Sequence, residues 1–299
     1  MQPPSPGPLD KQYMRVLFPY AYNILGSAED ARDAVQEVLV KHLSGPGHPV
    51  ADPKNYLIRS VVNLAITMKS RQKKTLRPGE RWLPEPVATD DAADRNLHLD
   101  DVLSYSLLVL MERLDARERA VFILRESFDY PHAEIAGLLS ITEEHSRKLL
   151  SRARASLFRP APKRTAARDA HDRHALEGFL RAIRQRDTQQ LETLMAADIG
   201  FYADGGGKVP LAAGTCLGAA PVAALLMRVY HTYLAAAEIR YTVINHQPAL
   251  LSYVAGRLTS CQVFDLHPER GTLLQINVVL DPDKLKSLSQ PSSDTLSTD

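Results

Sequence analysis

A run of cations near the middle of the chain could bind a nucleic acid. From Arg147 to Arg168 the sequence contains eight lysines and arginines and no carboxylate. Cationic and hydroxyl side chains on one helix face can contact phosphates and the edges of guanine in the major groove of duplex DNA. The outward face predicted for the helix that begins this run consists of Ser146, Arg147, Lys148, Ser151, Arg152 and Arg154.

Two short helices joined by a tight connection must position that face. Pro131 to Leu139 predicts the first helix, and the hydroxyl of Thr142 is a suitable N-cap for the second. Glu143 and Glu144 then fall in the positive first turn of that second helix. The arrangement is typical of a helix-turn-helix. An ordinary solvated helix surface is the alternative, and the segments upstream favour DNA binding.

A second helix with suitable side chains begins after Asp52-Pro53, which supplies a cap and a first-turn proline. Asn55, Arg59 and Asn63 recur at four-residue intervals, so its amides could meet bases. The helix then becomes strongly cationic and could hold a phosphate backbone through Lys69, Arg71, Lys73, Lys74 and Arg77.

The helix expected from Ser27 to about His42 has an acidic exposed side. Ser27 and Asp30 resemble a capping box at its start. Asp33, Gln36 and Glu37 continue the polar side, which lacks the histidine or further carboxylate that a metal site would need. This side is therefore either solvated or a docking surface for a basic partner. Another helix, from Leu9 to Leu25, precedes it and ends at Gly26.

Composition places the chain among ordinary globular proteins. It has 299 residues, 44% hydrophobic and 24% charged, with a net charge of +1, so its basic character is local. Cys216 and Cys261 fit neither a zinc spacing nor a disulfide framework and are expected to be reduced core thiols. The sequence shows no signal peptide and no run of about 18 apolar residues, so we expect a cytoplasmic protein without a membrane partner.

The segment from Arg77 to His98 interrupts the helices and contains the single tryptophan, Trp82, within WLPEP. WLPEP either docks on another part of the protein or forms a local turn. After Arg168 the pattern predicts a small α+β domain, because two helices precede a series of strands. The helices are Ala170 to Arg186 and Thr188 to Ala197, and the strands are Ile199 to Tyr202, Ile239 to Asn245, Ala249 to Leu258, Cys261 to Leu266 and Thr272 to Val279. A polar tail from Ser287 to Asp299 is expected to be disordered.

The α+β part carries residues that could support catalysis, but the sequence alone cannot place two of them together. The DGGGK segment at Asp204 to Lys208 lacks the spacing of a phosphate loop, so a glycine turn is its simplest interpretation. Acid–base chemistry would need a carboxylate paired with a donor. The candidates by residue type are Tyr202, Asp204, Tyr230, His231 and Asp265.

The order of these segments resembles the RNA polymerase sigma-70 family, specifically its extracytoplasmic-function (ECF) sigma factors. AYNILGSAEDARDAVQEV is similar to regions 2.1 to 2.2, and DPKNYLIRSVVNLAITMKSRQKK is similar to regions 2.3 to 2.4. The helix-turn-helix segment is similar to region 4. WLPEP, DGGGK and DPDKL, at 281 to 285, further resemble the subgroup with a fused SnoaL-like extension, whose cone-shaped α+β fold is shared with ketosteroid isomerase and polyketide cyclases.

The resemblance implies a multidomain chain with two all-α parts followed by an α+β part. Region 2 is expected at 8–76, a linker with WLPEP at 77–99, and the region 4 helix-turn-helix at 100–160. The SnoaL-like α+β domain is expected at 168–287, and the disordered tail at 288–299.

It also implies a sigma factor that binds core RNA polymerase and promoter DNA and has no catalytic chemistry, cofactor or metal. Asp33, Gln36 and Glu37 would contact the polymerase. The −10 element would be held by Asn55, Arg59, Asn63, Lys69, Arg71, Lys73 and Lys74. The −35 element would be contacted by Thr142, Ser146, Arg147, Lys148, Ser151, Arg152 and Arg154.

Regulation in cis by the C-terminal domain would replace a separate anti-sigma factor, and that domain could also hold a small ligand. The residues expected to contribute to this regulation are Trp82, Leu83, Pro84, Asp204, Gly205, Gly206, Gly207 and Lys208.

Two departures from the subgroup pattern bear on promoter preference. Thr67 stands where the subgroup usually has aspartate, and Glu143 or Glu144 could either favour cytosine or simply cap the helix. Two other functions stay open from the residues alone. The first is a ligand-sensing helix-turn-helix regulator that acts without polymerase, and the second is an isomerase-like or cyclase-like enzyme fused to a DNA-binding module.

Overall fold

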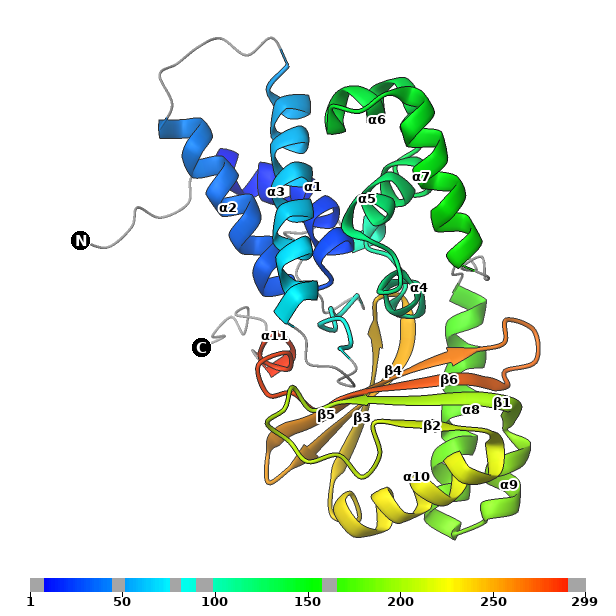
Figure 1. Cartoon of the computed structure of the whole chain (residues 1–299). Helices are drawn as coiled ribbons and strands as arrows, with labels where there is room; N and C mark the ends of the chain where they lie inside the picture. The colour runs from blue at the N-terminus through cyan, green and yellow to red at the C-terminus, as the bar shows by residue number, and fades with distance from the viewer. Residues whose placement is uncertain (1–7, 45–51, 76–81, 90–98, 158–165, 290–299) are drawn as a thin grey trace, which may run out of the picture. The chain divides into compact units, whose positions relative to one another are not determined.

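The computed structural model describes residues 8–44, 52–75, 82–89, 99–157 and 166–289 (Figure 1). The chain folds as two units. The first, called the helical unit below, comprises residues 1–76, 94–103 and 107–160. The second, the C-terminal unit, comprises residues 77–93, 104–106 and 161–299. The segment that joins the two helical regions therefore packs with the C-terminal unit.

The helical unit begins with three helices, α1 (Pro8–Leu25), α2 (Ala28–Ser44) and α3 (Pro53–Thr75). Gly26, at a φ of 73°, donates its N–H to Tyr22 and ends α1 as predicted. The N–H of Asp30 donates to the Ser27 hydroxyl at the start of α2, and that of Asn55 donates to the Asp52 carboxylate at the start of α3. Both predicted caps are present.

The remaining helices of this unit are η1 (Leu99–Asp101), α4 (Tyr105–Met111), α5 (Ala116–Glu126), α6 (His132–Leu139) and α7 (Glu143–Ser156). The first two residues of α4 belong to the C-terminal unit. Asp115 and Glu118 form a capping box at the start of α5. Helix α6 ends at Ser140, which has a left-handed φ of 53°, and α7 starts two residues after it at its Thr142 cap. The predicted helix-turn-helix is confirmed.

The C-terminal unit combines a six-stranded mixed sheet with helices. Its strands are β1 (Met195–Asp204), β2 (Thr215–Leu217), β3 (Glu238–Ile244), β4 (Gln247–Val254), β5 (Arg257–Leu266) and β6 (Leu273–Val279). They lie in the order β2-β1-β6-β5-β4-β3, with β1 and β6 parallel and the other neighbours antiparallel. The helices are α8 (Ala166–Gln185), α9 (Thr188–Thr193), α10 (Ala219–Tyr233) and α11 (Lys286–Ser289).

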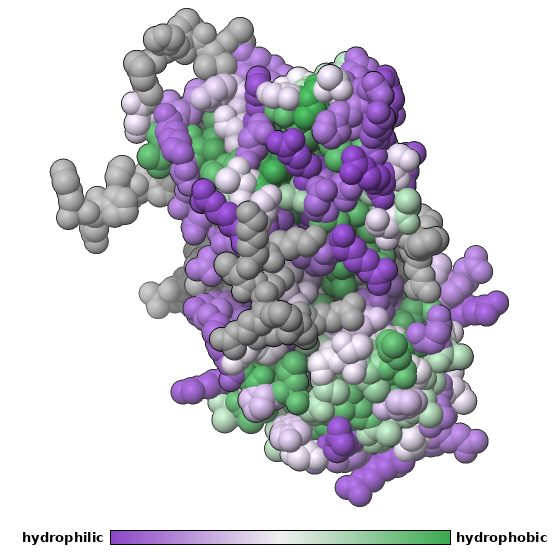
Figure 2. All heavy atoms as spheres, in the orientation of Figure 1, coloured by the Kyte–Doolittle hydropathy of each residue, from purple (hydrophilic) through white to green (hydrophobic). Residues whose placement is uncertain are grey.

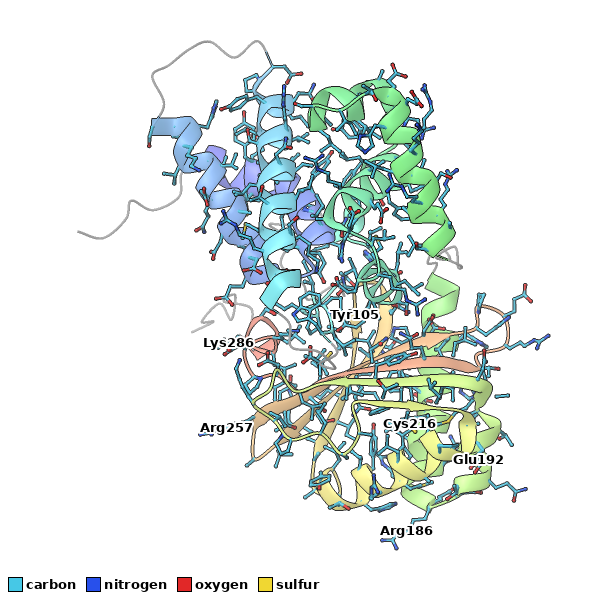
Figure 3. The ribbon with its side chains drawn as sticks, viewed as in Figure 1. Tyr105, Arg186, Glu192, Cys216, Arg257 and Lys286 are labelled. Atoms are coloured by element: carbon cyan, nitrogen blue, oxygen red, sulfur yellow. The ribbon has the colours of Figure 1, made fainter. Side chains whose placement is uncertain are left out.

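Apolar side chains fill the space between this sheet and helices α8, α9 and α10 (Figure 3). Phe179 of α8 meets the rings of Tyr230 and Phe264 edge-on, with centroid distances of 6.1 and 5.3 Å. Helices packed against the sheet form the α+β fold that the sequence predicted.

Several predicted boundaries in this unit are wrong. The helix expected from Thr188 to Ala197 ends at Thr193, because 195–204 form β1. The strand expected from Ala249 to Leu258 is two strands, β4 and β5, joined by a turn at Ala255 and Gly256 with positive φ angles. Helix α10 was not predicted. The expected tail partly overlaps α11, and residues 290–299 lie outside the described residues.

No helix among the described residues is both long and apolar enough to cross a membrane.

Candidate nucleic-acid interface and linker clasp

Helix α7 presents four cations to solvent. The side chains of Arg147, Lys148, Arg152 and Arg154 are each about 60 to 67% exposed. Hydrophilic residues accordingly cover the visible surface over α7 in Figure 2. Ser151, in the same helix, is also exposed. The predicted basic face is therefore accessible along most of its length.

Each of these cations lies near a carboxylate. Arg147 pairs with Glu143, and Lys148 with Glu144, both at 2.7 Å and four residues apart in the helix. Two further glutamates come from α5: Glu126 lies 2.6 Å from Arg154, and Glu118 lies 3.8 Å from Arg152. Exposed ion pairs contribute roughly 0 to 1 kcal/mol, so phosphates can displace them.

The N-terminal end of α7 has two different surroundings. Thr142 caps it by accepting the N–H of His145 at 3.1 Å, as predicted. The outward placement predicted for Ser146 is wrong, because this residue is fully buried and its hydroxyl lies 2.8 Å from Nδ1 of His132. Ser146 belongs to the inner stripe with Leu149, Leu150 and Ala153, one turn earlier than the apolar pattern alone indicated.

Helix α3 carries the second predicted DNA face. Asn55 and Arg71 are exposed, and the amide of Asn55 donates to Asp52 at 2.6 Å. Arg59 and Asn63 are also exposed, but each donates to the end of α6: Arg59 Nη2 to the Ser140 hydroxyl at 3.0 Å, and Asn63 Nδ2 to the Leu138 carbonyl at 3.0 Å. The side chains of Lys73 and Lys74 lie outside the described residues.

Lys69 does not lie on the cationic surface where the sequence placed it. It is buried, with 7% of its surface exposed, and its Nζ donates to both carboxylate oxygens of Glu112 at 2.8 and 2.9 Å. The same Nζ donates to the Leu25 carbonyl at 2.9 Å. The prediction for Lys69 was wrong because a long lysine side chain at the edge of the apolar stripe can turn inward when a carboxylate lies within reach.

The acidic side of α2 lies on the surface. Asp33, Gln36 and Glu37 are exposed, and Glu37 pairs with the exposed Lys41 one turn later. Among the described residues, no group of three or more His, Cys, Asp or Glu side chains could hold a metal ion. The surface thus offers carboxylate and amide groups to a basic partner.

In the C-terminal unit the linker is bound at its start by a cluster that we call the linker clasp: Trp82, Leu83, Asp204, Lys208, Asp281 and Lys284. Asp204 Oδ2 accepts the N–H of Leu83 at 2.8 Å and pairs with Lys284 Nζ at 2.7 Å. Lys284 also donates to the Leu83 carbonyl at 2.6 Å and lies 4.2 Å from the centre of the Trp82 ring. WLPEP and DGGGK are therefore in contact.

The glycines of DGGGK allow the chain to turn tightly beside the clasp. Gly206 has a φ of 59°, and a Cβ there would lie 2.2 Å from an Asp281 carboxylate oxygen. Its N–H instead donates to the other oxygen of Asp204 at 2.8 Å. Lys208 pairs with Asp281 at 3.0 Å and with Asp283, whose pKa is lowered to about 2 chiefly by the hydrogen bond from Lys208.

The end of the same linker segment extends the sheet. Ala88 forms an antiparallel bridge with Ile244 on the edge strand β3. The Val87 carbonyl accepts the N–H of Asn245 at 2.9 Å, and the Asn245 side chain accepts the N–H of Val87 at 3.0 Å. Between the two ends, Tyr105 donates its hydroxyl to the Pro84 carbonyl at 2.6 Å. Residues 82–89 are thus bound along their whole length.

Comparison with known proteins identifies the family of this chain. The family model for sigma-70 region 2 matches residues 9–75, and the model for sigma-70 region 4 matches residues 104–157. A probable ECF RNA polymerase sigma factor SigI of Mycobacterium tuberculosis is 30% identical over 277 residues, which span 90% of each chain. The chain belongs to the ECF sigma-70 family.

Other relatives agree with this assignment. The ECF sigma factor SigJ of M. tuberculosis is 28% identical over 221 residues, which span 73% of this chain and 70% of SigJ. The crystal structure of SigJ has a TM-score of 0.73, is 25% identical and covers 94% of this chain and 98% of its own. As an ECF sigma factor, the protein directs transcription initiation and is not an enzyme. Sigma factors bind core RNA polymerase and promoter DNA.

Three of the five catalytic candidates of this sigma factor bond to residues outside that set. Asp204 belongs to the clasp, Tyr230 donates to Gln262 at 2.8 Å, and His231 contacts the Ile183 carbonyl at 3.1 Å. Tyr202 lies on β1, opposite Asn277 of β6, and Asp265 lies on β5. Full burial raises the pKa of Tyr230, which keeps it neutral.

Several residues that organise these surfaces were not predicted. Glu112 and Arg119 form a buried cluster with Lys69, and Asn245 binds the linker. Glu112 and Arg119 lie in helix-forming sequence with no motif around them, so nothing local distinguishes them from surface charges. Lys284 lies within DPDKL, so that motif was the one signal that could have located it.

Proposed function

We propose that the exposed side chains described above make the contacts of this sigma factor. Asp33, Gln36 and Glu37 on α2 bind the core polymerase. The polar face of α3 binds the −10 element, chiefly through Asn55, Arg59 and Asn63. On α7, Arg147, Lys148 and Ser151 meet base edges of the −35 element, while Arg152 and Arg154 hold phosphates.

The exposure of these side chains supports the proposal. Carboxylates at about half exposure on α2 suit a basic docking partner, and Glu37 is 48% exposed. Asp33→Lys is expected to reduce retention of the chain on immobilised core polymerase, because it reverses the charge of that surface. Asp198→Lys, at an exposed position of β1, is the matched control. Equal retention of the two variants would contradict the assignment of α2.

We further propose that the C-terminal unit regulates initiation in cis through the linker. The observation that carries this proposal is the binding of residues 82–89 along the C-terminal unit, from the clasp to the edge of β3. Because this segment connects the regions proposed to read the −10 and −35 elements, holding it limits the distances that the two regions can span. The domain takes the place of a separate anti-sigma factor.

Run-off transcription with core polymerase tests this proposal. Promoters with the natural spacer and with spacers changed by one or two base pairs are compared for the native chain and for Asp204→Asn, which removes the ion pair with Lys284. The native chain is expected to discriminate among spacers, and the variant to discriminate less. Asp198→Asn is the control. Identical spacer dependence of Asp204→Asn and the native chain would contradict regulation through the linker.

A small ligand of the C-terminal domain is a second proposal with its own observation. Leu250 and Ser252 of β4 pair with Gln262 and Ser260 of β5, and Gln262 accepts the Tyr230 hydroxyl from α10. By strand alternation all four side chains therefore face the helices. Among the described atoms, the buried Ser252 and Ser260 hydroxyls have no hydrogen-bond partner. A ligand with a polar group would satisfy them, and a thermal-shift screen that includes a Ser252→Ala/Ser260→Ala control tests for one.

A further inference from the structure

Lys69 is a buried cation that donates to three acceptors among the described residues. Its Nζ bonds to both oxygens of Glu112 and to the Leu25 carbonyl. Leu25 ends α1, whereas Glu112 directly follows α4. The side chain therefore ties helices of region 2 to the start of region 4. It cannot contact a phosphate until these bonds break.

Arg119 continues this tie from the other side. It is fully buried, its Nε donates to the Asn23 carbonyl of α1 at 2.8 Å, and its Nη1 pairs with Glu112. Burial alone would raise the pKa of Glu112, but Arg119 and Lys69 outweigh it, so that the pKa is lowered and the carboxylate stays charged. We call Lys69, Glu112 and Arg119 the latch.

The latch is not fully satisfied. It contains two cations and one anion, and so carries a net charge of +1. Among the described atoms, Arg119 Nη2 is buried without a hydrogen-bond partner. A buried donor without a partner weakens a packed interface relative to a fully bonded one. The latch therefore holds the two regions together while leaving the interface less stable than its number of ion pairs would indicate.

Contacts along the rest of the interface reach the proposed −10 face. Tyr20 of α1 stacks on Phe128, which follows α5, with ring centroids 3.9 Å apart. At the far end, Arg59 and Asn63 donate to Ser140 and to the Leu138 carbonyl at the C-terminus of α6. The Leu138 carbonyl is one of the last carbonyls of α6, which lack donors within the helix, and the Asn63 amide supplies a donor to it. Together with the Ser140 hydroxyl it occupies N–H groups that we assign to the −10 strand.

From these contacts we infer that the free chain closes on itself, with the end of α6 occupying N–H groups of Arg59 and Asn63 on the −10 face and the latch holding region 4 there. Lys69 is then a positioning residue for this closed state instead of a phosphate ligand. The inference rests on the proposed −10 role of Arg59 and Asn63, because the same N–H groups cannot donate to α6 and to a base at once. Opening must precede binding of the −10 strand.

Distance measurements between nitroxide labels test the closed state without DNA or polymerase. The labels are placed at the exposed Gln12 of α1 and Glu134 of α6, in the full chain with Cys216→Ser and with the buried Cys261 retained. With the latch intact, the two labels are expected to give one narrow distance distribution. Glu112→Gln should lengthen and broaden it, because the variant leaves two buried cations without their carboxylate.

Lys69→Met and Arg113→Met complete the set. Lys69→Met leaves no buried charge without a partner, because Glu112 still pairs with Arg119. This variant is therefore expected to fold and to test the latch even if Glu112→Gln does not fold. It should broaden the distribution by less than Glu112→Gln. Arg113 is exposed and adjacent to the latch, and Arg113→Met should leave the distribution unchanged. Native-like distributions in both latch variants would overturn the inference.

Binding of a fluorescent single-stranded −10 oligonucleotide separates this inference from the proposed function. Both latch variants should bind it more tightly than the native chain, with a gain of about fivefold or more for Glu112→Gln. A longer distance between the labels with unchanged oligonucleotide binding would support the latch and would contradict the −10 role of Arg59 and Asn63.

Discussion

The linker clasp and the latch are both clusters of charged side chains, but they differ in how many of their polar atoms have hydrogen-bond partners. In the clasp, both oxygens of Asp204 are bonded, and Lys284 bonds to Asp204 and Leu83 while facing Trp82. In the latch, a guanidinium nitrogen of Arg119 lacks a partner among the described atoms, and cations outnumber carboxylates. A satisfied polar cluster suits a permanent attachment, whereas an incomplete one suits an interface that must separate.

The largest expected effect would break the clasp. Asp204→Ala removes the carboxylate that pairs with the Lys284 ammonium, whose side chain is only 12% exposed, and that accepts the Leu83 N–H. The variant should destabilise the C-terminal unit by about 3 kcal/mol or more. Trp82 is the single tryptophan, so its fluorescence reports release of the linker during urea unfolding. Asp198→Ala, on the exposed part of β1, should have little effect. If both variants lost equal stability, the clasp would not be a permanent attachment.

A smaller effect separates backbone strain from the clasp itself. Gly206 and Gly256 both have positive φ angles, 59° and 76°. Ala at Gly256 has open space around its Cβ and should cost only the backbone penalty, about 1 to 2 kcal/mol. Ala at Gly206 should cost clearly more, because the Cβ would collide with Asp281. The hydrogen-exchange rate of the Leu83 amide should rise for Gly206→Ala alone. An equal rise for both variants would show that backbone strain by itself is enough to loosen the clasp.

The smallest effects on stability are expected on α7, where ion pairs are exposed. Arg147→Ala and Arg154→Ala should each change the free energy of unfolding by no more than roughly 0.5 kcal/mol. Their effects on DNA should differ. Arg147→Ala should relax the −35 preference at one position and cost roughly 1 to 3 kcal/mol, whereas Arg154→Ala should weaken binding to all sequences evenly and reduce its salt dependence. Promoter binding by the holoenzyme at several salt concentrations measures both.

The contrast between the two variants is what tests the division of α7 into base-reading and phosphate-holding residues. Identical sequence preferences and identical salt dependence of binding would show that the two arginines make the same kind of contact with DNA. Loss of thermal stability in either variant would instead indicate that the pairs with Glu143 and Glu126 support the fold.

Local sequence determined the helices, caps and turns of this protein. Gly26, Asp52 and Thr142 end or cap helices where the sequence predicted, because a cap depends on atoms within about four residues. The helix-turn-helix was equally readable, since its apolar stripes and its connection are local patterns. The motifs around Trp82 and Asp204 indicated a contact, although no local rule states its geometry.

Only the tertiary structure decided which charged side chains turn inward. Lys69 and Arg71 are two residues apart in the same cationic run, yet one is buried against Glu112 and the other is exposed. The helical pattern likewise predicts Ser146 on the outer face, whereas its contact with His132 places it inside. The physical reason is that a charge is buried only when a distant segment supplies its partner, and no spacing along the chain encodes that meeting.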